Sequence, residues 1–203
     1  MNIEKSVWDY VKVRKIDEYM SGHKGFIAGG CFKNIFTNNK IKDIDIFFEN
    51  ERDRVEAEIY YEKNEDYYDY YKNDKVRAFK NKHSNITIEL VKTLYGTPEK
   101  ILDNFDFTIT KFAYFKKIEI DEENEEKVTY NVLFNKNFFE HLLLKRTVLD
   151  DKILFPISTF ERMIRYTSYG FYPCRETKKK LIEAIHELSV IPDVSMGLYS
   201  GLD

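Results

Sequence analysis

Two glycines followed by two aspartates form the segment of this chain with the clearest chemical meaning. Gly29 and Gly30 end a short apolar run at residues 26–28, which predicts a strand. Asp43 and Asp45 stand two positions apart in a second apolar run. Side chains of a strand alternate between its two faces, so both carboxylates project from the same face. The alternative is a surface strand with two solvated acids, but unpaired carboxylates are costly to desolvate among isoleucine and phenylalanine.

This arrangement of residue types predicts a metal–nucleotide site. Backbone amides at a glycine-rich helix start bind phosphate, and Lys33 would add positive charge in the first turn of a helix expected near residues 31–37. Carboxylates hold Mg²⁺ or Mn²⁺, and two such ions about 3.5–4 Å apart would orient an NTP, activate an acceptor hydroxyl and stabilise pyrophosphate. Glu89, on a later predicted strand, is a candidate third carboxylate; an exposed polar position explains it equally well.

Composition limits the classes of protein that remain. The 203 residues suffice for one core, and a net charge of −3 excludes a strongly basic nucleic-acid coat while allowing a local basic patch. Cys31 and Cys174 offer neither a disulfide framework nor zinc spacing, and Cys31 is interpreted as a small residue of the glycine turn. With no leader and no apolar run of about 18–20 residues, we expect a cytoplasmic protein with no membrane partner. Abundant Lys, Asn, Ile and Tyr indicate an AT-rich genome, such as that of a low-GC bacterium or its phage.

Hydrophobic periodicity predicts an α+β fold. Helices are expected over residues 3–20, 51–61, from 97 onward, 138–145, 158–169 and 176–188. Further strands are expected over 76–80 and 86–91. A hairpin is expected within 116–134, with its turn at 121–126. The tyrosine-rich residues 67–71 are expected to be a helix end or a loop. A stacking platform for nucleic acid is the alternative there, which the nearby acids Glu65, Asp66, Asp69 and Asp74 disfavour. The four histidines are scattered, and packing or surface roles are expected for each: His23, His83, His141 and His186.

Three blocks of the chain together resemble a known family. The pair Gly29-Gly30 followed by Asp43-Ile-Asp45 is similar to the signature of the nucleotidyltransferase superfamily, which includes DNA polymerase β, poly(A) polymerases and CCA-adding enzymes. The run from Asp106 to Tyr114 resembles the Arg-Arg-Asp-Phe-Thr-Ile-Asn-Ala segment of bacterial-type CCA-adding enzymes and poly(A) polymerases, and residues 160–171 resemble their arginine-rich helix with its Gly-Phe sequel. The blocks occur in the family's order.

The resemblance implies a nucleotidyltransferase fold, a mixed β-sheet flanked by helices, with a head at 1–135 and a short C-terminal helical neck at 136–203, or one continuous domain. It also implies that Asp43 and Asp45 bind the metal and that Asp106, Arg162 and Arg165 lie near the bound nucleotide. The chain departs from the pattern where the family has its double arginine, here Asn104-Phe105, and at Lys33-Asn34, Thr110 and Glu161. CCA-adding activity therefore does not follow.

The leading hypothesis is a metal-dependent transferase that moves a nucleoside monophosphate (NMP) from an NTP to a hydroxyl, with an RNA or tRNA 3′ end as the best candidate acceptor. The competing hypothesis is a catalytically altered, phage-like binding or inhibitory protein that grips RNA, a nucleotide or a host protein. Residues 50–73 and the tail from Ile191 are expected places for such a protein partner to dock.

Overall fold

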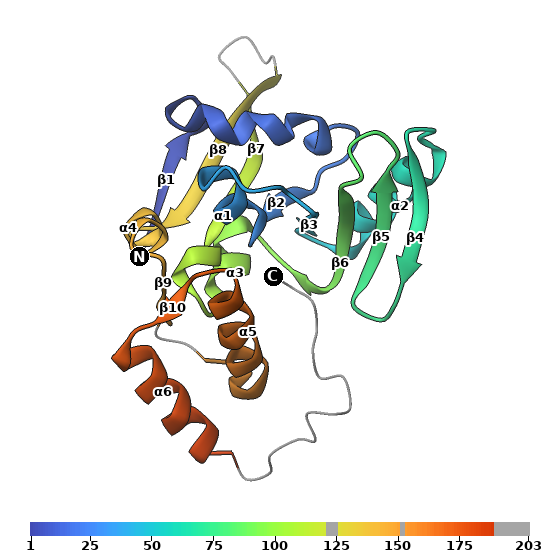
Figure 1. The fold of residues 1–203 in the computed structure, drawn as a ribbon. Coiled ribbons are helices and arrows are strands. Elements are labelled where there is room, and N and C mark those ends of the chain that lie inside the picture. Colours follow the sequence, from blue (N-terminus) through green and yellow to red (C-terminus); the bar gives the residue numbers. More distant parts are fainter. Residues whose placement is uncertain (121–125, 151–152, 189–203) are drawn as a thin grey trace.

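The computed structural model describes residues 1–120, 126–150 and 153–188, and shows an α+β fold built on one large mixed sheet (Figure 1). The sheet has the strand order β1-β8-β7-β2-β3-β6-β5-β4. Its strands are β1 (Asn2–Ser6), β2 (Phe26–Ala28), β3 (Asp43–Phe48), β4 (Tyr67–Lys72), β5 (Val76–Asn81), β6 (Thr87–Tyr95), β7 (Phe112–Ile120) and β8 (Glu126–Asn135). The predicted fold class is thereby confirmed.

The strand pairing explains why one face of the sheet is available for a site. β3 and β6 pair in parallel, and the other neighbours pair antiparallel. α2 (Glu51–Lys63) lies on the face opposite the aspartates: its buried Tyr61 stacks on Phe79, which stands in one cross-strand row with Ile88 and Ile44. Side chains that share a row share a face. The aspartates therefore project from the face that α2 leaves uncovered.

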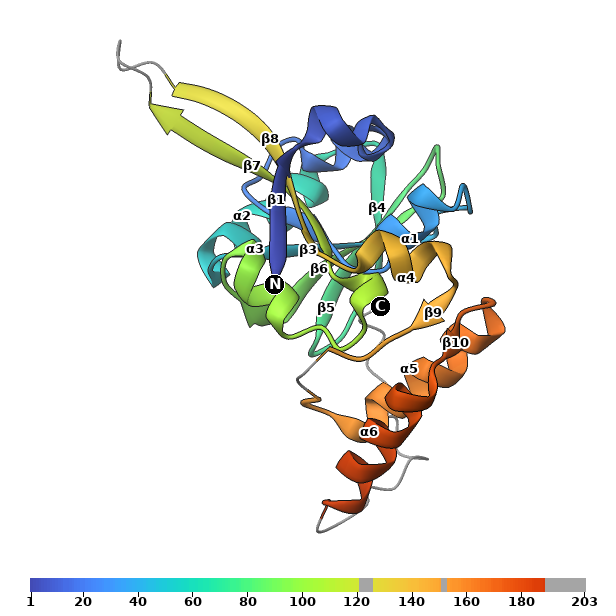
Figure 2. The same ribbon diagram turned by 90° about the vertical axis from the view of Figure 1, so that its left-hand side faces the viewer.

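The remaining helices pack against the sheet or against each other. η1 (Val7–Met20), α1 (Cys31–Phe36), α3 (Pro98–Asp103) and η2 (Thr108–Thr110) flank the central strands, and α4 (Phe138–Leu143) contributes Phe138 to the same aromatic core as Phe112. α5 (Pro156–Ser168) and α6 (Arg175–His186) lie together below the sheet, as Figure 1 shows, and Figure 2 shows the β7–β8 hairpin extending away on the other side. A small parallel sheet joins β9 (Arg146–Thr147) to β10 (Tyr172–Pro173).

Two local predictions were wrong. The helix expected over residues 3–20 begins only at Val7, because residues 2–6 form β1 and pair with β8. Residues 67–72 form β4, an edge strand, instead of a helix end or loop. Both strands take their stability from pairing with partners distant in sequence, which local periodicity does not report. Residues 121–125 of the predicted turn and the tail from Ile191 lie outside the described residues.

A buried histidine links the stability of this fold to pH. Nδ1 of His23 accepts a hydrogen bond from the backbone N–H of Gly25 at 3.0 Å, and Nε2 lies 3.0 Å from the carbonyl oxygen of Tyr19. A carbonyl can only accept, so Nε2 carries the proton and the ring is neutral. Burial, with the nearby charge of Lys116, lowers the pKa of His23 to about 4.

Stability is expected to fall as the pH is lowered from about 6.5 to 4, because the unfolded chain, with a histidine pKa of about 6.5, binds a proton that the folded chain excludes. The pKa difference corresponds to about 3 kcal/mol of unfolding free energy across this window. Chemical denaturation at a series of pH values will measure it in the wild type and in His23→Gln. The carboxylates titrate in both proteins, so the difference between the curves isolates His23; parallel curves would contradict the assignment.

Candidate nucleotide and metal site

The glycine turn has the backbone geometry that only glycine adopts readily. Gly29 has φ = 107°, and its N–H donates to the carbonyl of Phe112 at 3.0 Å, which anchors the turn to β7. A side chain on Gly29 would be strained at this φ. Gly30 is the N-cap residue of α1. The strand, turn and short helix therefore follow one another as the sequence predicts.

Asp43 and Asp45 share one face of β3, at its N-terminal end. Asp43 is exposed, whereas Asp45 is buried with 5% of its surface accessible. Partial desolvation raises the pKa of Asp43, opposed by a hydrogen bond from Thr87 and by the positive charges of Lys42 and Lys80. A cation bound nearby would favour the ionised form of these carboxylates.

The third predicted carboxylate, Glu89, stands beside Asp45 in the parallel register of β3 and β6. The same cross-strand row continues through Ala78 on β5 to Tyr71 on β4. The small side chain of Ala78 lets the Tyr71 hydroxyl reach across and donate a hydrogen bond to Glu89 Oε1. Burial and the neighbouring Glu89 raise the pKa of Tyr71, so this phenol stays protonated. Tyr71 was missed at the sequence level, since residues 67–71 carried no strand signal.

A cavity of about 350 Å³ brings several of the predicted site residues together. Its lining includes Gly30, Cys31, Lys33, Asn34, Asn39, Lys40, Lys42, Asp43, Asp45, Tyr166, Tyr169 and Phe171. The ammonium of Lys33 lies 5.2 Å from the ring centre of Tyr169 and donates to Asn34 Oδ1 at 2.8 Å. Burial, with the charge of Asp45, raises the pKa of the Cys31 thiol well above its usual value, so Cys31 is no nucleophile at neutral pH.

Asp106 and Arg162 lie together, but in a second cavity of about 430 Å³ whose lining also includes Phe47, Phe105 and Tyr166. The guanidinium of Arg162 donates to Asp106 Oδ2 at 2.5 Å and 3.1 Å, and the hydroxyl of Thr159 donates to the same oxygen at 2.7 Å. Arg162 was expected to contact the nucleotide's phosphates or base; in this structure its guanidinium is engaged by a carboxylate.

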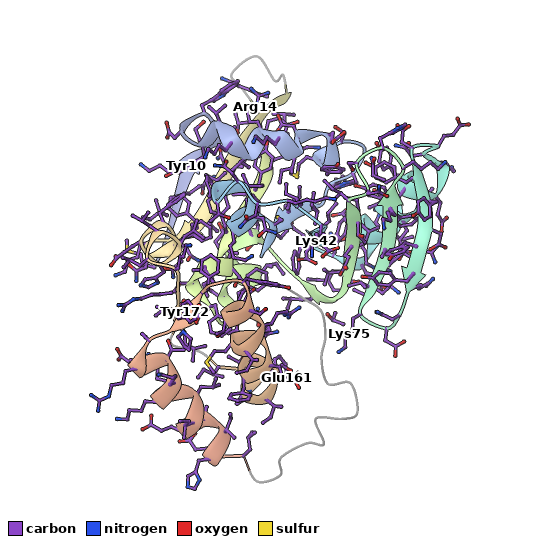
Figure 3. The ribbon with its side chains drawn as sticks, viewed as in Figure 1. Tyr10, Arg14, Lys42, Lys75, Glu161 and Tyr172 are labelled. Carbon is purple, nitrogen blue, oxygen red and sulfur yellow. The ribbon has the colours of Figure 1, made fainter. Side chains whose placement is uncertain are left out.

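Tyr166 lines both cavities, so they adjoin along α5. Glu161 and Arg165 also project from α5, and neither lines the cavity of the aspartates; Figure 3 labels Glu161 on this helix. The structure thus gathers the glycine–aspartate part of the predicted site in one cavity, and Asp106 with Arg162 in its neighbour.

The donor set fits an open magnesium or manganese site. Within the described ranges, no group of three or more His, Cys, Asp or Glu side chains is placed to hold a metal ion together, so a metal here would need ligands from the substrate. Mg²⁺ is commonly held by one or two carboxylates together with substrate phosphates, and Asp43 and Asp45 on the wall of the 350 Å³ cavity match that requirement. Metal binding by Asp43, Asp45 and Glu89 stays a prediction.

Solved structures show which fold this arrangement belongs to. A CCA-adding enzyme in complex with ATP superimposes with a TM-score of 0.61 at 19% identity, and one with CTP gives 0.58 at 18%; each match covers 92% of this chain and 46% of the other. The Thermotoga maritima CCA-adding enzyme complexed with tRNA gives 0.56 at 17%, covering 92% and 47%. This chain spans about half the length of these structures, and no curated protein matches it. The likeness confirms a nucleotidyltransferase fold.

In the part of the chain that the structure describes, no helix is long and apolar enough to cross a bilayer.

A family model described as "Gabija anti-defense 2 family protein" matches residues 2–145, which include the glycine turn, the aspartates and Glu89. The match covers more than half of the sequence. The chain therefore belongs to the Gad2, or Gabija anti-defense 2, family.

Proposed function

We propose that this protein is a metal-dependent nucleotidyltransferase that moves an NMP from an NTP to a hydroxyl acceptor and releases pyrophosphate. The observation that carries the proposal is the cavity in which Gly30, Lys33, Asp43 and Asp45 converge. Its lining combines the backbone of the glycine turn, the side chains of Lys33, Lys40 and Lys42, and two carboxylates on a strand. Such a set of groups suits the binding of a metal-bound triphosphate.

Each residue has a distinct part in the proposed reaction. The turn at Gly29 and Gly30 lets the backbone approach the triphosphate, and Lys33 neutralises part of its charge. Asp43 and Asp45 would hold Mg²⁺ or Mn²⁺, which when bound supplies Lewis-acid stabilisation of the phosphates. Glu89 would accept the proton of the acceptor hydroxyl. The acceptor oxygen then bonds to the α-phosphorus while the bond to the pyrophosphate oxygen breaks.

The acceptor that we propose is an RNA 3′ end, with tRNA as one candidate. Among proteins of similar fold, one solved structure is a tRNA nucleotidyltransferase with a primer tRNA and an ATP analogue, and it matches with a TM-score of 0.52 at 18% identity. Since such identity supports the fold alone, an RNA acceptor also requires a basic surface on this chain.

The family name indicates a role in countering the Gabija defence, in keeping with a phage-type protein. A second candidate function follows from it: an inhibitory protein with this fold that grips RNA, a nucleotide or a host protein without catalysis. The changed positions Asn104 and Phe105, and the engagement of Arg162 by Asp106, favour this candidate because they alter the predicted nucleotide-reading groups.

One experiment separates the two candidates. The purified protein is incubated with each labelled NTP, Mg²⁺ or Mn²⁺ and total RNA, beside the Asp43→Ala/Asp45→Ala variant. Label transfer that disappears in the variant supports the transferase. If neither protein transfers label from any NTP, and both the wild type and the variant still counter the Gabija defence in cells, the transferase proposal is wrong and the inhibitory protein is supported.

A further inference from the structure

We infer that a third hollow, on the β4–β5 side of Asp43, is the acceptor subsite and takes the 3′ end of a single-stranded nucleic acid. The inference rests on the proposed function and deepens it. The hollow measures about 560 Å³ and is lined by Lys40, Lys42, Asp43, Tyr70, Tyr71, Lys80, Asn85 and Thr87.

The position of the hollow relative to the aspartates fits an acceptor. Asp43 lines this hollow and also the cavity of the glycine turn, as do Lys40 and Lys42, so the two hollows adjoin at this segment. In-line displacement requires the attacking hydroxyl and the leaving pyrophosphate to lie on opposite sides of the transferred phosphorus. With the triphosphate on the glycine side of Asp43, the acceptor belongs on the β4–β5 side.

The charge of the hollow fits a polyanion. Lys40, Lys42 and Lys80 line it, and among the described residues none of them forms an ion pair with a carboxylate. Lys80 stands in one cross-strand row with Thr87 and Asp43. Three lysines around one aspartate make a local basic patch on a chain whose net charge is −3. Of the neighbouring acids, Asp69 on β4 is paired with Arg77.

Exposed tyrosine rings favour nucleic acid over an acidic peptide. Tyr70 and Tyr68 are 49% and 43% exposed, and the ring of Tyr70 lies 4.7 Å from the ammonium of Lys80. The ring centres of Tyr70 and Tyr71 are 5.3 Å apart. Alternating cations and aromatic faces are the means by which proteins hold single strands, because each base can stack and each phosphate can pair.

Tyr71 marks where the terminal hydroxyl would lie. It lines the hollow, and its own hydroxyl donates to Glu89 in the row that contains Asp45. A ribose 3′-hydroxyl that displaces the phenol from Glu89 would find the same hydrogen-bond acceptor beside the aspartates. The proton leaves to Glu89 as the oxygen bonds to the α-phosphorus, and pyrophosphate departs.

The test measures binding without NTP, by fluorescence anisotropy of a short labelled single-stranded RNA. Tyr70→Ala is expected to weaken binding roughly 5- to 100-fold through lost stacking, whereas Tyr70→Phe keeps the ring and the affinity. Lys80→Glu is expected to weaken binding and to make the plot of log affinity against log salt shallower by about 0.7 or more. Lys63→Glu is the charge-matched control, because this exposed lysine ends α2 on the opposite face.

Each outcome has a separate meaning. Equal RNA affinity in all variants, or no RNA binding alongside capture of a polyglutamate peptide, would overturn the subsite even if NMP transfer to another acceptor were found. RNA binding that depends on Tyr70 and Lys80, together with transfer to that RNA, supports it. The same binding without any transfer would overturn the subsite's role as an acceptor and, separately, the proposed transferase. Circular dichroism of every variant checks that the sheet is intact.

Discussion

Asp45→Asn is expected to lower the rate of NMP transfer about 1,000-fold while leaving the fold in place. Asparagine has the shape of aspartate but lacks the negative charge needed to hold Mg²⁺ among the phosphates. Metal stabilisation of the transferring group is worth several kcal/mol, and each 1.36 kcal/mol is a factor of ten in rate. Asp45 is expected to show the effect clearly because it is buried beside Glu89, where bulk solvent screens the loss of a charge only weakly.

The measurement is single-turnover transfer of label from a saturating NTP, with thermal unfolding as the check on folding. Asp103→Asn is the matched control, since this aspartate ends α3, is exposed and lines neither cavity described for the nucleotide. A rate within tenfold of the wild type in Asp45→Asn, or an equal loss in Asp103→Asn, would contradict a metal-binding role for Asp45.

The glycine–aspartate part of the site was predictable because its signals are local. A strand that ends at Gly29 needs a residue that tolerates positive φ, and the period of two along β3 places Asp43 and Asp45 on one face whatever the rest of the chain does. The ranges expected for β2, β5, α1 and α2 also agree closely with the structure, since each carries a clear local pattern.

Features that depend on pairing between distant segments were not predictable. β4 reads as a polar, tyrosine-rich stretch, and it is a strand because β5 offers it an edge. The contact between Tyr71 and Glu89 requires β4, β5 and β6 to be in register and Ala78 to leave room between them. The sequence around each of these residues does not indicate which of the others it contacts.

The role of Arg162 shows the same limit. Its three-residue spacing from Arg165 correctly indicates neighbouring positions on one helix, but spacing does not say which partner the guanidinium meets. The structure places Asp106 there, at the junction of α5 with the segment between α3 and η2. The family resemblance implied that Asp106 and Arg162 lie near a bound nucleotide, which stays a prediction. The structure pairs the two side chains with each other.

Arg162→Ala is expected to lower the free energy of unfolding by about 3–5 kcal/mol, because it leaves the carboxylate of Asp106 buried without its cation. Among the residues that the structure describes, only Thr159 and the N–H of Phe107 would still donate to that carboxylate. The loss corresponds to a fall in Tm of roughly 6 to 20 °C for a chain of this size. Urea and thermal denaturation will measure it.

Arg52→Ala supplies the comparison, since Arg52 pairs with Glu56 at 3.1 Å but is 86% exposed, and such surface pairs contribute about 1 kcal/mol or less. A double-mutant cycle with Asp106→Asn then tests whether the energy belongs to the pair: Asn needs no cation, so removing Arg162 from that background is expected to cost much less. If Arg162 instead served the nucleotide directly, Arg162→Ala would leave stability unchanged and raise only the KM for NTP. If Arg162→Ala lowers the stability and raises the KM for NTP only slightly, the ion pair holds one wall of the site in place. The small rise in KM would come from Tyr166, which lines both cavities and lies on the same helix, α5.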